Sequence, residues 1–306
     1  MGSFYVAASG NVAQTVQTAA RQLGIRVEGV TSRPGSLAAI RMPRVALWDT
    51  YGGSMPSGWT RWIMEQYELP FTVVYPNEIN AGNLRAKYDV LILPDGAIPN
   101  QGGGGFGGGG GGGQQRQPPD SLRHMVGRLG DQTVPHIKAF IEAGGEVLAI
   151  GGSTRLAYQL NLPVKSALVE RTASGEERPL PGEKFYVPGS LLEVAVDTSA
   201  SIAWGSPRNV DVMFDDSPAF KLDADAASKG LRTIAWYDSP KPLRSGWAWG
   251  QEHLNGAAAI IEARMGQGSL YMFGPEILFR AQPHGTFRFF FNALTDPSRS
   301  TAPLTP

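Results

Sequence analysis

The sequence predicts an α/β fold: a parallel sheet with helices on both faces, followed by a β-rich C-terminal portion. Three observations predict it. Short apolar runs typical of buried strands alternate with segments of helical spacing between residues 44 and 160. Beyond residue 163 the strand-like segments are short and are joined by Pro, Gly and Asp turns. A strongly apolar segment of helical spacing, residues 287–294, closes the domain.

The first 40 residues are expected to form an arm or linker with a βαβ-like order. Residues 4–8 and 24–30 are typical of strands, and residues 11–23 have the spacing of an amphipathic helix, with Asn11 as its cap. The opening residues have neither a basic region nor a long apolar region, so they do not resemble a signal peptide.

The main domain is expected to span residues 41–299. Residues 58–69 have helical spacing, with Trp59, Trp62, Ile63, Gln66 and Tyr67 near one face. A short helix or turn is expected between the second and third strands, and helical segments on both sides of the fourth. The four expected strands of the parallel sheet are residues 44–50, 70–76, 88–96 and 145–152.

Low complexity sets residues 101–117 apart as a flexible glycine-rich loop. No Gly-Lys-Ser/Thr follows it, so it is not a phosphate-binding loop. Two helices are expected after it, and a hairpin is expected around residues 266–268. Residues 300–306 form a tail.

Composition excludes several classes of function. The 27 basic and 27 acidic residues cancel, which predicts neither a nucleic-acid partner nor a membrane-binding patch. The absence of Cys excludes disulfides, thiolate nucleophiles and Cys-ligated metals. Apolar runs fall short of the ~20 residues that span a bilayer. None of the four histidines begins a His-x-x-Glu pair, so we expect no metal or other cofactor in this chain.

Ser153 lies where a strand, two glycines and a helix meet. Such a corner exposes a nucleophile at the carboxyl edge of a sheet. The match to Gly-x-Ser-x-Gly is loose, because Arg155 replaces the second glycine. A serine also needs a base and an orienting partner in order to react. We therefore expect Ser153 to cap the following helix, with the nucleophile as the less favoured alternative.

An aromatic and acidic group lies in the segment SGWAWGQEHLNG. It combines Trp247, Trp249, Glu252 and His253, which predicts a surface for a peptide or sugar. The alternative, which we favour, is that two tryptophans at alternate positions pack on one face of a strand.

The strand that ends at Phe273 is followed by Gly274-Pro275-Glu276. This resembles the place where class I glutamine amidotransferases, which have a flavodoxin-like fold, carry His-Pro-Glu. The resemblance makes Ser153 the nucleophile position, Gly274 the base position and Glu276 the orienting residue. Glycine cannot accept a proton, and His284 can replace it only if its loop folds back.

Several blocks together resemble the C-terminal region of bacterial zinc carboxypeptidases of the carboxypeptidase A/T type. The most specific are GGSMPSGWTRW and QPHGT. In that family a metallopeptidase domain precedes an amidotransferase-like domain. The resemblance implies an exported, secreted or periplasmic protein whose zinc is bound only by the upstream domain. It implies that this chain is a non-catalytic accessory domain, a pseudoenzyme that packs on the peptidase domain or binds its substrate.

Two rival functions and one further association stay open at this stage. The chain can be a serine-dependent amidase or esterase that uses Ser153, with His284 or His253 as base and Glu276 as orienter. It can be a peptide- or glycan-binding module that uses Trp247 and Trp249. A homo-oligomer can also form through the strand-like segment over residues 4–8, because an unpaired edge recruits another chain.

Overall fold

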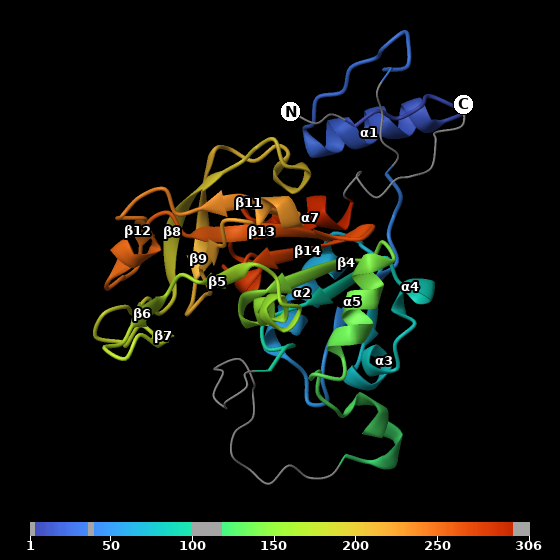
Figure 1. The fold of residues 1–306 in the computed structure, drawn as a ribbon. Helices are drawn as coiled ribbons and strands as arrows, with labels where there is room; N and C mark the ends of the chain where they lie inside the picture. Colours follow the sequence, from blue (N-terminus) through green and yellow to red (C-terminus); the bar gives the residue numbers. More distant parts are fainter. Residues whose placement is uncertain (1–3, 36–39, 100–117, 296–306) are drawn as a thin grey trace.

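A computed structural model describes residues 4–35, 40–99 and 118–295 of the chain (Figure 1). The loop expected over residues 101–117 and the tail expected over residues 300–306 lie outside these described residues.

The N-terminal arm contains one helix, α1 (Val12–Leu23), and its described residues form no strands. The helix confirms the prediction, although the Asn11 side chain that precedes it makes no capping hydrogen bond. The strands predicted over residues 4–8 and 24–30 are wrong, because neither segment has a neighbouring strand to pair with its backbone groups. Figure 1 shows α1 to one side of the sheet.

Five parallel strands form the centre of the molecule. Their spatial order is β14-β4-β3-β1-β2, and each pairs in parallel with its neighbour. Numbered along the chain, this is the order 2-1-3-4-5, which defines the flavodoxin-like class. The predicted fold class is therefore confirmed. The strands are β1 (Val45–Trp48), β2 (Thr72–Val74), β3 (Val90–Leu93), β4 (Glu146–Ile150) and β14 (Gly268–Phe273).

Helices cover both faces of this sheet. Side chains alternate along β3, so that Val90 and Ile92 join one buried cluster and Leu91 and Leu93 join the other. On the first face lie α2 (Met55–Gln66) and α7 (Phe287–Leu294). The opposite face is covered by α3 (Pro76–Asn80), α4 (Leu84–Lys87), α5 (Val134–Glu142) and α6 (Leu156–Gln159).

The β-rich C-terminal portion continues the same sheet. The hairpin between β13 (Ala258–Met265) and β14 confirms the turn predicted at residues 266–268, and it joins antiparallel strands to the parallel ones. Twelve strands share this sheet, and β6 (Val169–Arg171) and β7 (Glu177–Pro179) pair separately. The others are β5 (Val164–Ser166), β8 (Ser190–Val196), β9 (Asn209–Phe214), β10 (Phe220–Leu222), β11 (Leu231–Trp236) and β12 (Leu243–Ser245).

The helix α2 differs from its prediction in start and in buried face. It begins before residue 58 because the Ser54 hydroxyl accepts a hydrogen bond from Ser57 N at 3.5 Å. Trp62 and Tyr67, which the helical spacing placed near the same face as Ile63, are exposed, whereas Ile63 is buried. The buried positions of this helix are Ser57, Thr60, Ile63 and Met64.

The remaining helical turns are of the 3₁₀ type. The segment after residue 120 was predicted as a regular helix and is a 3₁₀ turn. The 3₁₀ turns are η1 (Asp120–Met125), η2 (Gly151–Arg155), η3 (Ser201–Ala203), η4 (Ala227–Lys229), η5 (Gln251–Leu254) and η6 (Phe279–Ala281).

Among the described residues, no helix has the length and hydrophobicity needed to cross a bilayer.

Candidate functional site

The carboxyl ends of three neighbouring strands meet at one edge of the sheet. Asp95 follows β3, Gly151 to Ser153 follow β4, and Gly274 to Glu276 follow β14. Because β4 pairs in parallel with both of the other strands, these segments lie side by side. In open α/β sheets this edge is where ligands bind.

Ser153 is fully buried, and its hydroxyl is held by the segment after β3. The hydroxyl donates to the Pro94 carbonyl oxygen at 2.6 Å and accepts from Ile98 N at 3.2 Å. The predicted helix cap is therefore wrong. The 3₁₀ turn begins at Gly151, whose φ is +57°, so Ser153 lies inside the turn and points toward the neighbouring strand end.

The position of the amidotransferase base has no room for a side chain. A Cβ at Gly274 would overlap the carbonyl oxygen of Pro218 and would lie 3.0 Å from the carbonyl oxygen of Ala259. Gly274 N also donates to that Ala259 oxygen at 2.9 Å, which fixes the strand end. The backbone of the β-rich portion thus occupies the space in which a base would stand.

Neither histidine proposed as a substitute base is bonded to Ser153. The His284 ring packs against the Phe287 ring, with centroids 5.1 Å apart. His253 belongs to η5 and lines a cavity formed with Trp249. Within the described residues, the hydrogen bonds of the Ser153 hydroxyl go to Pro94 and Ile98 alone.

Glu276 lies near the carboxyl group of Asp95, a residue that the sequence analysis did not predict as part of the site. A Cβ at Gly151 would touch Glu276 Oε1 on one side and Asp95 Oδ1, at 2.8 Å, on the other. The two oxygens therefore lie within about 5 Å of each other, where like charges disfavour double ionisation. Asp95 lies near the end of the strand-like run YDVLILPDG. Its position after a strand of the parallel sheet could have predicted that it belongs to the site.

Both carboxyl groups hold their protons more tightly than usual. Burial raises the pKa of Glu276 to about 8, with smaller contributions from the negative charges of Asp95 and Asp215. Burial also raises the pKa of Asp95, against the effect of Gly152 N, which donates to its Oδ1 at 2.6 Å. Neither carboxyl group is hydrogen-bonded to the Ser153 hydroxyl, which is bonded to Pro94 and Ile98.

The described part of the chain contains no set of side chains arranged to bind a metal ion. No group of three His, Asp or Glu side chains there is arranged to hold a metal ion. The acidic residues at the sheet edge are spread over the ends of several strands.

The second candidate site is an aromatic surface, which we define as Tyr186, Trp247 and Trp249. Trp247 and Trp249 are 52% and 54% exposed, so the favoured interpretation that they pack on a strand face is wrong. They lie after β12, in the segment that leads to η5. Exposed tryptophans gathered in this way are unusual on a soluble domain.

The rings of the aromatic surface are held in place. Trp249 pairs with Tyr186 through two backbone hydrogen bonds of 3.0 Å, and its Nε1 donates to the Glu183 carbonyl at 2.7 Å. Tyr186 meets Trp247 edge to face, with centroids 5.8 Å apart. A cavity of about 410 Å³ adjoins Trp249 and is also lined by Glu252 and His253. Of the four residues predicted to bind a ligand, three therefore line one cavity, and Trp247 lies beside it.

Comparisons with known proteins find similar solved structures at low sequence identity. No family model matches the chain, and no curated protein matches it. Among solved structures, a putative GMP synthase protein from Thermoplasma acidophilum is 13% identical, with a TM-score of 0.46 over 83% of this chain and 93% of that one. A putative ThuA-like protein from Bacteroides uniformis is 10% identical, with a TM-score of 0.43 over 86% and 94%.

Larger proteins are also among the structures that this chain resembles. A β-galactosidase from Bacillus circulans sp. alkalophilus is 10% identical, with a TM-score of 0.42 over 82% of this chain. This chain spans only 30% of the length of that enzyme.

Proposed function

We propose that this chain is a non-catalytic accessory domain that acts by contact with another domain or with its substrate. The observation that supports this most strongly is the closed base position at Gly274. Without a group to remove its proton, a serine hydroxyl at neutral pH is a poor nucleophile. The Ser153 hydroxyl already donates to Pro94, which favours a structural role.

Ser153→Ala separates the two roles. We expect no change in hydrolysis of p-nitrophenyl acetate or of a glutamine amide by the isolated chain in the presence of a metal chelator. We expect the free energy of unfolding to fall by about 1–3 kcal/mol, because the buried Ile98 N–H and Pro94 carbonyl lose their partner. Enzyme assays and urea titration measure the two quantities.

Ser228→Ala is the matched control, because its exposed hydroxyl also donates to a carbonyl, that of Asp225, at 2.7 Å. It should leave stability nearly unchanged. Hydrolysis by the wild-type chain that disappears in Ser153→Ala would contradict the proposal and favour the serine amidase or esterase.

We further propose that the partner domain is a zinc carboxypeptidase domain of the A/T type in an exported protein. The support is the resemblance of the GGSMPSGWTRW and QPHGT blocks. The zinc then belongs to that domain. Sequencing the coding region that precedes residue 1 tests this: a His-x-x-Glu motif with a distal His supports it, and any other domain there contradicts it.

A second candidate function is ligand binding at the aromatic surface. The observation that favours it is the exposure of Trp247 and Trp249 beside a cavity with carboxylate and imidazole groups. Rings that are fixed before binding lose little conformational freedom when a ligand arrives. A sugar ring or an aromatic or proline side chain of a peptide fits such a surface.

Trp249→Ala should weaken binding of a ligand of this surface about tenfold or more, which corresponds to ~1.4 kcal/mol. Calorimetry with cello-, chito- and maltohexaose and a proline-rich peptide provides the measurement. Trp62→Ala is the control, because Trp62 is also exposed but lies on α2. Equal loss in both variants, or no binding by the wild type, would count against this function.

A further inference from the structure

The strand β9 has one unpaired edge. Among the described strands it pairs only with β8, in an antiparallel register that continues to Arg208, whose carbonyl accepts from Val196 N at 2.8 Å. Hydrogen bonding to β8 alternates along an antiparallel strand. The backbone groups of Asn209, Asp211 and Met213 therefore point away from β8; we call these three residues the β9 edge.

Most groups of the β9 edge have no backbone partner within the described chain. The Met213 carbonyl accepts from Glu276 N at 3.0 Å, which confirms the direction in which the edge points. The N–H of Met213 and both backbone groups of Asp211 and Asn209 stay open. Such a row of donors and acceptors is a template for one more strand.

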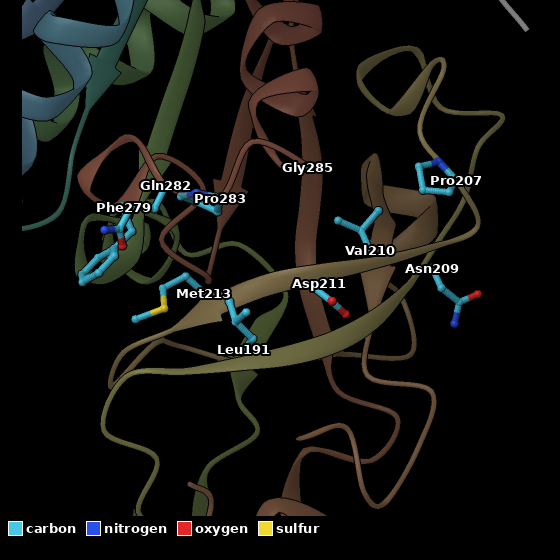
Figure 2. A pocket seen from close by; sticks show the side chains of 10 residues that line it. All are labelled: Leu191, Pro207, Asn209, Val210, Asp211, Met213, Phe279, Gln282, Pro283 and Gly285. Atoms are coloured by element: carbon cyan, nitrogen blue, oxygen red, sulfur yellow. The ribbon is translucent and has the colours of Figure 1, made fainter. Parts of the chain in front are cut away.

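A cavity of about 530 Å³ follows the β9 edge (Figure 2). Figure 2 shows Phe279, Gln282 and Pro283 on the opposite side of β9 from Leu191. Met213 and Phe279 lie toward one end of the cavity together with Gln282, and Asn209 lies at the other end with Pro207 and Val210. An added strand would thus meet the large apolar side chains of Met213 and Phe279 at one end of the edge.

Residues 279–283 form the wall of the cavity that faces β9, and their backbone is strained but fixed by hydrogen bonds. Arg280 and Ala281 both have positive φ, 47° and 56°, although neither is glycine. Thr286 fixes the segment, since its hydroxyl contacts the carbonyl oxygens of Ile277 at 2.5 Å and Pro283 at 2.8 Å. Strain of this kind persists where the surroundings determine the backbone, often at binding sites.

The chain also contains a segment without regular structure and without a partner among the described residues, residues 4–8. Phe4 is 80% exposed and Val6 is 55% exposed, and the segment makes no hydrogen bond within the described residues. Five extended residues span about 17 Å, the same length as residues 209–213. The β9 edge lacks a partner strand. Residues 4–8 have the length and the free backbone groups to be that strand.

We propose that residues 4–8 of one copy of this chain bind to the β9 edge of a second copy as an added antiparallel strand. In this register Val6 pairs with Asp211 and Ala8 with Asn209, while Phe4 lies toward Met213, whose carbonyl is already bonded to Glu276 N. Phe4, the largest apolar side chain of the segment, then lies near Met213 and Phe279, and the small Ala8 lies near Asn209. A parallel strand would place Phe4 near Asn209 instead. If each copy donates to the other, the dimer closes with twofold symmetry.

Light scattering across a range of concentrations tests the association. The wild type should form dimers, and Val6→Asp should raise the dissociation constant about tenfold or more, because the apolar contact of Val6 is lost and a carboxylate is desolvated in its place. Val27→Asp is the matched control, since Val27 is exposed in another segment of the same arm that has no regular structure. A monomeric wild type, or equal weakening by both variants, would overturn the proposal.

Cross-linking tests the register independently, and the absence of native Cys makes the result unambiguous. A Val6→Cys chain mixed with an Asp211→Cys chain should give a mixed dimer with a short bismaleimide. A mixture of Val6→Cys with Asp225→Cys should not, because Asp225 is exposed on another part of the surface. Dimers without the Val6–Asp211 product would show that another surface associates.

Discussion

Gly274→Ala is expected to lower the free energy of unfolding by about 3 kcal/mol or more. The added Cβ would overlap the carbonyl oxygen of Pro218, which is backbone and cannot turn aside as a flexible side chain does. It would also lie 3.0 Å from the Ala259 oxygen to which Gly274 N is bonded. Two antiparallel segments of the β-rich portion would have to move away from the end of β14. Urea unfolding followed by tryptophan fluorescence measures the loss.

Gly285→Ala is the matched control for this variant. Its nearest neighbour to a new Cβ is Val210 Cγ1 at 3.9 Å, an ordinary contact, and its φ is not positive. We expect a change within about 0.5 kcal/mol. If Gly274→Ala were as stable as the wild type, the base position would have room for a side chain. The main support for a non-catalytic domain would then be lost.

The parallel half of the fold was predictable because its signals are local. Each buried strand is a short apolar run, and helical spacing separates the runs, so the order of elements could be read before the structure was known. The segments over residues 4–8 and 24–30 have the same local signal and form no strands. A strand needs a neighbour, and the sequence does not say whether one is in reach.

The candidate site was predictable in position but not in detail. The resemblance to class I glutamine amidotransferases grouped Ser153, Gly274 and Glu276, and the structure brings these residues to one edge because β4 and β14 run parallel and end together. The sequence did not predict the bond from Ser153 to Pro94, which links residues 59 positions apart, or the overlap at Gly274 with Pro218. Such contacts depend on how the strands come together and leave no periodic pattern in the sequence.

Glu276→Gln is expected to change how stability depends on pH. The pKa of Glu276 is about 8 in the folded chain, against about 4.3 for an unperturbed glutamic acid. Between these values the folded state binds more protons than the unfolded state, so the wild type should lose stability as pH rises from about 4.5 to 8. The neutral glutamine avoids the ionisation. We expect the variant to be more stable than the wild type by about 2–4 kcal/mol at pH 9 and to show a flatter profile.

Unfolding free energies at several pH values test this, with Glu176→Gln as a control because Glu176 is exposed and outside the acidic cluster. The control should keep the wild-type slope. A loss of stability in Glu276→Gln at every pH would mean that the ionised carboxylate is stabilised by the fold. That result would agree with an orienting role for an imidazole. A carboxyl group that orients a histidine base must be ionised in order to stabilise the imidazolium. A protonated Glu276 beside Asp95 therefore agrees with the absence of a histidine at position 274.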